Sequence, residues 1–244
     1  MSRLKKLLFR ASIAIIVVVG VATIFVEPAY RNEPLKAWDP EVGYRHTFAW
    51  DQYVEGSDDM LFAIAFSGGG TRAAAFGYGV LEELRDTTIS IDGEQRRLLD
   101  EVDWVSGVSG GSFIAAYYSL YGDRIFEDFE ERFLKRDVRK DLIFELAKPT
   151  NWIRLLSARF NRSDLAAEFY DREIFGGGTF GDIERAGGKK AVINATDVST
   201  GNPFFFVQDQ FDFICSDLSS FPVGRAVAAS AAVPVAFPPV TLRN

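Results

Sequence analysis

One serine, Ser109, lies among small residues in the stretch 103–118, DWVSGVSGGSFIAAYY. Glycines stand two residues before it and one and two residues after it, at Gly107, Gly110 and Gly111. This G-x-S-x-G frame is typical of a nucleophile elbow, a sharp strand-to-helix turn that exposes a hydroxyl and has no room for neighbouring side chains. The chemistry that the pattern predicts is nucleophilic attack by a serine on an acyl carbonyl.

The neighbouring serines do not have this frame. Ser106 has Trp104 two residues before it, and Ser112 has Ile114 two residues after it. Ser109 as an ordinary helix N-cap is the alternative interpretation, but an N-cap does not require glycines on both sides. We therefore expect the elbow to consist of Gly107, Val108, Ser109, Gly110 and Gly111.

A second glycine turn precedes the serine, in LFAIAFSGGGTRAAAFGYGVLEELRD. The apolar run 61–66 predicts a buried strand, and 71–85 predicts a helix. Backbone N–H groups at such a turn, at the positive end of a helix dipole, can bind an anion. A phosphate-binding P-loop is excluded because G-K-[ST] is absent. A turn without a ligand, a dinucleotide site and the oxyanion hole of acyl transfer remain open on this turn alone.

The elements around Ser109 favour acyl transfer. Residues 102–106 predict a second strand, and 113–121 predict a helix that is apolar nearly all round and therefore buried. The two turns together would supply a nucleophile and the oxyanion donors. We expect these donors to be the N–H groups of Gly69, Gly70 and Gly110.

At these residues the sequence resembles the patatin-like phospholipase family, which pairs a Gly-Gly-Gly-x-Arg-Gly oxyanion loop with a G-x-S-x-G serine. The segments YDREIFGGGTFGDIE, VINATDVSTGNPFFF and AVAASAAVPVAFPPV also resemble family members, so that the resemblance covers about 61–240. The sequence departs from the family at Ala73, where glycine is usual. The oxyanion motif here is Gly68, Gly69, Gly70, Thr71, Arg72 and Ala73.

The resemblance implies an α/β fold, a three-layer α/β/α sandwich, and hydrolysis of lipid acyl esters through an acyl-enzyme by a Ser–Asp dyad. Substrates would be membrane lipids or lysophospholipids, and the reaction would need no cofactor and no metal. The family's aspartate lies in Asp-Gly-[Gly/Ala] after the ASAAVP segment, so we expect the base after Asn244. The resemblance gives Asp197 a structural role. His46 precedes Ser109, whereas the histidine of an α/β-hydrolase triad follows the serine.

Composition and the amino terminus limit partners and location. A net charge of −7 argues against a nucleic-acid partner, and one cysteine, Cys215, excludes an internal disulfide. Basic residues precede the apolar run 11–26, which predicts a single membrane span with the domain on the non-cytoplasmic side. A cleaved signal that leaves a secreted or periplasmic protein is the alternative. The expected organisation is an anchor or signal at 1–30, a linker at 31–59 and a patatin-like domain at 60–244, incomplete at its carboxyl end.

Two other functions remain open from the sequence. The first is a catalytically silent, lipid-binding scaffold of the same fold. The second is a dinucleotide-binding protein, because Gly68, Gly70 and Ala73 match G-x-G-x-x-G except at its last glycine.

Overall fold

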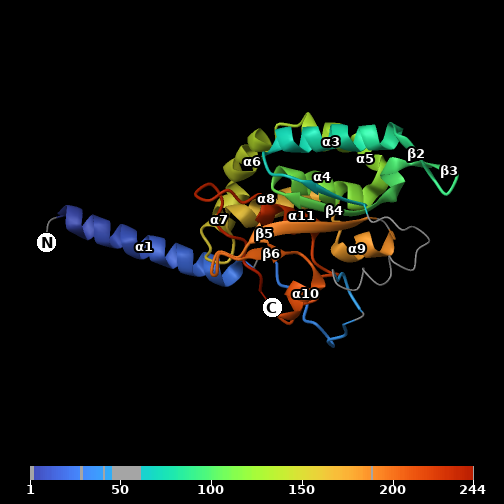
Figure 1. Cartoon of the computed structure of the whole chain (residues 1–244). Helices are drawn as coiled ribbons and strands as arrows, with labels where there is room; N and C mark the ends of the chain where they lie inside the picture. Colours follow the sequence, from blue (N-terminus) through green and yellow to red (C-terminus); the bar gives the residue numbers. More distant parts are fainter. Residues whose placement is uncertain (1–2, 28–29, 41, 46–61, 188, 244) are drawn as a thin grey trace.

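The structure is a computed structural model that describes residues 3–27, 30–40, 42–45, 62–187 and 189–243. The predictions on His46 fall outside these residues. The described helices and strands form an α/β domain from which one long helix extends (Figure 1).

A four-stranded sheet organises the domain. Its strand order is β1 (Phe62–Phe66), β4 (Val102–Val108), β5 (Lys190–Thr196) and β6 (Pro203–Phe205). The first three strands run parallel, and β6 is antiparallel to β5. A separate hairpin joins β2 (Thr88–Ile91) and β3 (Glu94–Arg97). The predicted α/β class and both predicted strands are confirmed, whereas the three-layer sandwich stays a prediction.

The two helices that follow β1 and β4 stack on the sheet. Helix α3 (Thr71–Asp86) packs on α4 (Gly110–Tyr121), and α4 packs on β1, β4 and β5 (Figure 1). Ten of the twelve residues of α4 are buried, as its apolar sequence predicts. The remaining helices are α5 (Ile125–Phe129), α6 (Val138–Ala147), α7 (Pro149–Leu155), α8 (Arg162–Glu173), α9 (Phe180–Arg185), α10 (Gln208–Asp212) and α11 (Val223–Ser230), with short helical turns at Leu98–Glu101, Gly122–Arg124 and Glu130–Leu134.

Aromatic side chains fill the core between α4 and its neighbours. Phe113 stacks on Phe133 with 4.2 Å between ring centroids, and it meets the edge of Tyr170 at 4.9 Å. Such pairs add about 0.5–1.5 kcal/mol each beyond the area they bury. They hold α4, which begins directly after Ser109, against the helices around it.

The described part of the predicted linker is packed against the domain. Tyr44 and Arg45 are buried. The Leu35 N–H donates to the Cys215 carbonyl at 2.9 Å, and the Gln208 N–H donates to the Tyr44 carbonyl at 2.8 Å. Residues 30–40 and 42–45 therefore contribute to the folded structure.

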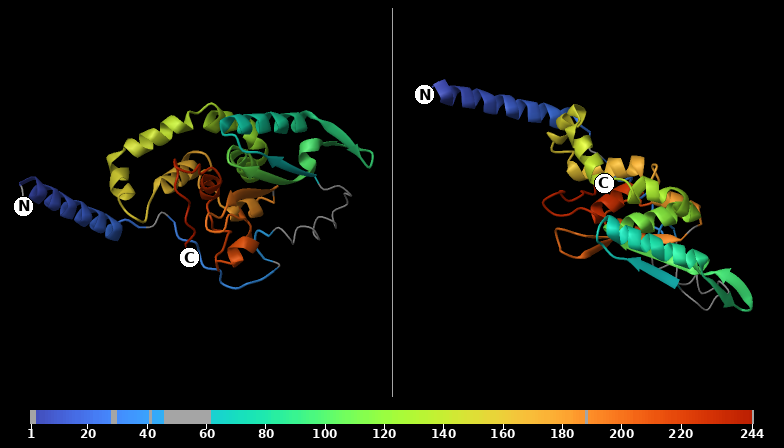
Figure 2. Two further views of the ribbon diagram at one scale, coloured as in Figure 1. Left: turned by 60° about the vertical axis from the view of Figure 1, so that its left-hand side comes forward. Right: turned by 90° about the horizontal axis from the view of Figure 1, so that it is seen from above.

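Helix α1 (Arg3–Phe25) extends away from the domain (Figure 2). No helix in the described parts of the chain has the length and apolarity needed to cross a membrane. The expected membrane span is therefore not supported. The predicted localisation remains a prediction.

Candidate active site

Ser109 lies at the point where β4 ends and α4 begins. Its backbone has φ 52° and ψ −117°, a conformation that residues with a side chain rarely adopt. Its N–H donates to Ser230 Oγ at 2.8 Å. The turn therefore has the sharp geometry of a nucleophile elbow. The hydrogen bond to Ser230, which is distant in the sequence, stabilises it.

The glycines around Ser109 make backbone contacts that exclude a side chain. A Cβ on Gly107 would lie 2.5 Å from the Gly111 carbonyl oxygen, and one on Gly111 would lie 2.4 Å from the Phe66 carbonyl oxygen. A Cβ on Gly110 would lie 2.1 Å from the Gly70 carbonyl oxygen. Distances below 3.0 Å essentially do not occur for real Cβ atoms, so the spacing of these glycines has a direct steric cause.

These contacts also place the two glycine turns side by side. Gly70 touches Gly110, and a Cβ on Gly68 would lie 3.4 Å from Ser109 Cβ. Gly69 and Gly70 have φ of 142° and 64°, which favour glycine. Within the described residues, the N–H groups of Gly69, Gly70 and Gly110 donate no hydrogen bond. Three backbone donors from two turns therefore remain available beside the serine.

The rest of the oxyanion motif starts α3. Thr71 and Arg72 are exposed in its first turn. Ala73, the departure from the family pattern, is half-buried, and a Cβ on Gly69 would lie 3.2 Å from the Ala73 methyl group. The alanine fits beneath the loop as long as position 69 has no side chain.

Two supporting residues carry no assignment from sequence. Ser230, the last residue of α11, holds the Ser109 N–H and lies 2.7 Å from Ser112 Oγ. Asn194 on β5 donates to the Gly107 carbonyl at 2.8 Å and to Ser106 Oγ at 2.8 Å. The only sequence signal for Ser230 was its place in the segment AVAASAAVPVAFPPV.

The predicted dyad partner is not among the described residues near the serine. No described Asp or Glu carboxylate forms a hydrogen bond with Ser109 Oγ. The Asp197 carboxylate accepts bonds from the Ser199 N–H at 2.8 Å, from Ser199 Oγ at 2.7 Å and from Thr200 Oγ1 at 2.8 Å. These bonds lower the pKa of Asp197 and hold the turn before β6. The described residues also contain no cluster of three His, Cys, Asp or Glu that could hold a metal.

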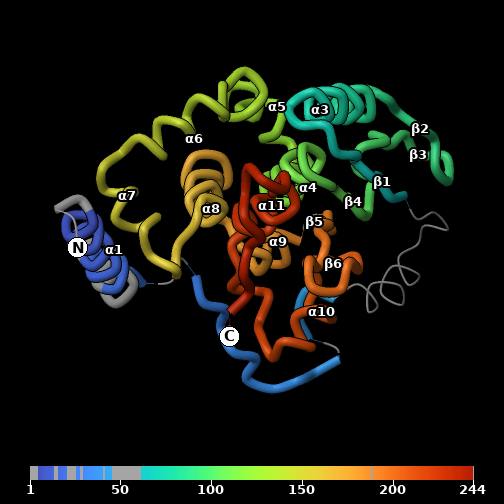
Figure 3. Tube along the Cα trace, turned by 90° about the vertical axis from the view of Figure 1, so that its left-hand side faces the viewer, coloured from blue at the N-terminus to red at the C-terminus, as the bar shows by residue number. Residues whose placement is uncertain are grey.

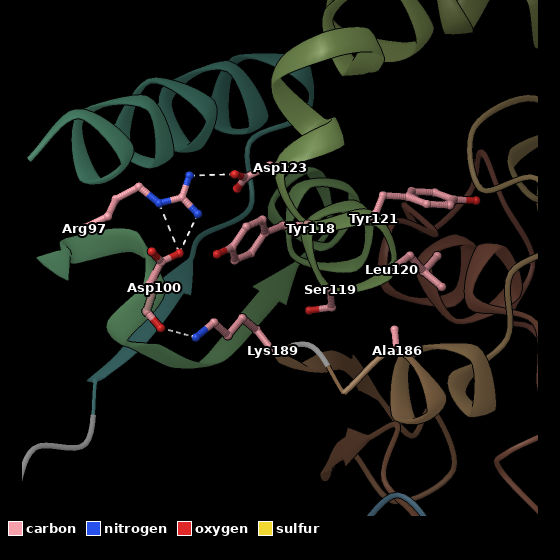
Figure 4. A pocket seen from close by; sticks show the side chains of 10 residues that line it. Arg97, Asp100, Tyr118, Ser119, Leu120, Tyr121, Asp123, Ala186 and Lys189 are labelled. Atoms are coloured by element: carbon pink, nitrogen blue, oxygen red, sulfur yellow. Dashed lines mark hydrogen bonds and ion pairs between the residues drawn. The ribbon is translucent and has the colours of Figure 1, made fainter. Parts of the chain in front are cut away.

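A cavity of about 360 Å³ lies elsewhere, at the carboxyl end of α4 (Figure 4). Ser119 and Lys189 line it together with a network in which Arg97 binds Asp100 and Asp123. Burial lowers the pKa of Lys189. Ser109 is at the opposite end of α4, roughly 16 Å away at 1.5 Å per residue, so the cavity is separate from the elbow.

Comparisons with known proteins identify the family of the chain. A model of the patatin-like phospholipase family matches residues 64–244. Among solved structures, a chain of the heterodimeric ExoU–SpcU complex from the type III secretion system of Pseudomonas aeruginosa is similar to this chain, with 16 % identity and a TM-score of 0.37. That match covers 71 % of this chain and 36 % of the other. No relative was found among the curated proteins. Because the family model matches well over half of its length, the chain belongs to the patatin-like phospholipase family.

Proposed function

We propose that this protein hydrolyses acyl esters of lipids, with Ser109 as the nucleophile. The observation that carries the proposal is the contact between the two glycine turns, which places three N–H groups without hydrogen bonds beside a strained serine. Family membership supports phospholipids or lysophospholipids as the substrate class.

The proposed reaction has two halves. Ser109 Oγ attacks the ester carbonyl while an aspartate base takes its proton, and the N–H groups of Gly69, Gly70 and Gly110 stabilise the tetrahedral oxyanion. Collapse of this intermediate breaks the ester bond, the leaving alcohol takes the proton from the aspartate, and an acyl-enzyme remains. Water then attacks the acyl-enzyme while the aspartate takes one of its protons, and this proton passes to Ser109 Oγ as the fatty acid leaves.

Labelling of the full-length protein with a fluorophosphonate probe tests the nucleophile. Wild type should be labelled and should hydrolyse a p-nitrophenyl acyl ester, while Ser109→Ala should do neither. Ser119→Ala is the matched control, because Ser119 lies on the same helix and its Oγ has no hydrogen-bond partner within the described residues. A Ser109→Ala variant that retains more than a few per cent of the activity would exclude this nucleophile.

A catalytically silent lipid-binding scaffold is the second candidate. It has the same family fold and needs no base beside Ser109. The same experiment separates the two functions, since a scaffold would bind lipid without being labelled. The dinucleotide alternative receives no support from the family match.

A further inference from the structure

Two consecutive helices carry large apolar side chains on their outer surface. On α6 these are Ile143 and Phe144, and on α7 they are Trp152 and Ile153, each with 55–61 % of its surface exposed. Leu156, just after α7, is also exposed. We call these five residues the α6–α7 patch. The patch needs an explanation because several exposed large apolar residues on two neighbouring helices are typical of sites of interaction.

The two helices hold the patch in one fixed arrangement. Trp152 Nε1 donates to the Leu146 carbonyl at 2.8 Å, and Asn151 Nδ2 donates to the Glu145 carbonyl at 2.8 Å. Both bonds cross the short connection between α6 and α7. The apolar side chains are therefore displayed by ordered helices.

Within α6, the charged side chains without an ion-pair partner among the described residues are basic. The acidic groups of α6 are occupied: Asp141 binds Arg136 at 2.5 Å, and Glu145 binds both Lys148 and Arg172. Arg139 and Lys140 are exposed and have no carboxylate partner within the described residues. The Lys140 ammonium lies 5.8 Å from the Phe144 ring centroid. This local positive charge contrasts with the net charge of −7 for the whole chain.

The helices that carry the patch lie at the same end of the sheet as the elbow. Helices α6 and α7 lie toward the carboxyl ends of β1 and β4, where both glycine turns are found (Figures 1 and 3). Val108, next to Ser109, and Val235, just after α11, are also exposed apolar residues. The Val235 carbonyl accepts a bond from Arg162 of α8 at 3.3 Å. Exposed apolar surface thus occurs both at the patch and at the elbow.

We propose that the α6–α7 patch docks on an anionic lipid surface and so presents the elbow to that surface. Aromatic and aliphatic side chains with adjacent free basic groups are the chemistry of an interfacial helix, in which the apolar face enters the lipid boundary and Lys or Arg bind anionic headgroups. The inference rests on the proposed function for its catalytic consequence, whereas docking itself is measured without catalysis.

Co-sedimentation of the full-length protein with vesicles of equimolar phosphatidylcholine and phosphatidylglycerol tests docking. The double variant Phe144→Ser and Ile153→Ser should partition at least about tenfold more weakly than wild type, because burial of one such side chain is worth about a factor of ten or more. Phe213→Ser is the matched control, since Phe213 is 85 % exposed on another element. Helix α1 is unchanged in every variant, so its own exposed apolar residues cannot produce the difference.

A second pair of substitutions tests whether the patch recognises anionic headgroups. The double variant Arg139→Gln and Lys140→Gln should weaken partition to the anionic vesicles and leave partition to pure phosphatidylcholine vesicles unchanged. Equal effects on both vesicle types would contradict recognition of anionic headgroups.

Activity measurements separate failure of docking from failure of the active site. The Phe144→Ser and Ile153→Ser variant should hydrolyse a dispersed short-chain ester like wild type and lose activity on vesicle lipid. Ser109→Ala should lose both activities and still bind vesicles. Wild-type partition by the apolar double variant would overturn the proposal. So would sedimentation showing that the patch is covered by a second copy of the chain.

Discussion

Ser109 holds a backbone conformation that costs on the order of 1–3 kcal/mol for a residue with a side chain. Such strain persists only where surrounding bonds determine the geometry. Here the Ser230 hydroxyl accepts from the Ser109 N–H and pairs with Ser112 Oγ, while Asn194 holds the Gly107 carbonyl. Ser230 and Asn194 are therefore positioning residues for the proposed nucleophile.

Ser230→Ala should lower both stability and activity. The substitution leaves the Ser109 N–H without its acceptor, which costs about 1–3 kcal/mol for a buried donor. We expect kcat to fall with little change in KM, because the elbow shifts while the surface that we propose to bind lipid is unchanged. Urea unfolding and ester hydrolysis measure the two effects.

Ser230→Thr and Ser112→Ala are the controls for this prediction. The threonine keeps a hydroxyl acceptor and should restore most of the activity. Ser112→Ala removes the other partner of Ser230 and leaves the Ser109 N–H bonded. A Ser230→Ala enzyme with the turnover of wild type would show that the elbow does not depend on this hydroxyl.

Gly110→Ala should reduce turnover by displacing the oxyanion loop. The new methyl group would meet the Gly70 carbonyl oxygen at 2.1 Å, so one turn must move away from the other. Loss of one oxyanion donor typically lowers kcat by about 10²–10³. Kinetics on a variant shown to be folded by circular dichroism measure the loss.

Gly79→Ala is the matched control for Gly110→Ala. Gly79 is a helical glycine of α3 with no atom within 4 Å of an added Cβ. Alanine there should stabilise α3 by about 0.5–1 kcal/mol and leave kcat unchanged. If Gly110→Ala were equally harmless, the contact between the turns would have no role in catalysis.

At the residue scale, the sequence predicted what local spacing determines. The glycines around Ser109 and the loop Gly68–Gly70 lie within a few residues of the strands and helices that they connect. Their spacing can therefore be recognised in the sequence. Ser230 was not predicted, because its bond to Ser109 joins positions 121 residues apart. A serine at the end of an alanine-rich helix gives no local sign of that partner.

At the scale of elements, α8 and α11 are joined by a buried ion pair. Arg225 Nη2 lies 2.8 Å from Asp164 Oδ1, and both side chains are 6 % exposed. Asp164 also takes part in the capping box that begins α8, where it accepts from the Asn161 N–H at 2.9 Å. Because α11 carries Ser230, this pair helps to place the residue that holds the elbow.

Arg225→Met should therefore destabilise the protein by about 3–5 kcal/mol, since it leaves the Asp164 carboxylate buried without its cation. Chemical denaturation measures the change. Arg185→Met is the comparison, because the Arg185–Asp182 pair is 70 % and 45 % exposed, and such pairs contribute at most about 1 kcal/mol. Similar losses of unfolding free energy in the two variants would contradict a larger contribution from the buried pair.

At the scale of the whole molecule, the amino-terminal segment shows what the sequence could not reveal. Residues 31–59 were expected to form a linker because they are polar and contain prolines and a glycine. In the structure, the described part of this segment pairs with residues far along the chain, such as Asp217, whose N–H donates to the Glu33 carbonyl at 2.8 Å. Such pairing depends on backbone groups and has no periodicity in the sequence.

Arg45 adds ion pairs to these long-range backbone contacts. Its guanidinium lies 2.7 Å from Asp212 and 3.2 Å from Asp209 at α10. Burial alone would raise the pKa of Asp212, but the hydrogen bonds from Arg45 and Gln208 lower it below its ordinary value. A carboxyl group with a lowered pKa in the folded state stabilises the protein above its unfolded-state pKa, about 3.9, and this contribution is lost as the pH falls through the folded-state pKa.

Arg45→Met should accordingly destabilise the protein by about 1–3 kcal/mol at pH 7, because the half-buried Asp212 carboxylate keeps its charge and loses its cation. The difference from wild type should narrow as the pH falls below about 3.9, the unfolded-state pKa, because the stabilisation that comes from the lowered pKa of Asp212 is then progressively lost. Urea unfolding of both proteins at pH 7, 5 and 3 measures the trend. A difference that is constant across this range would mean that Arg45 acts by packing alone, and a difference that grows at low pH would contradict the assigned direction of the Asp212 shift.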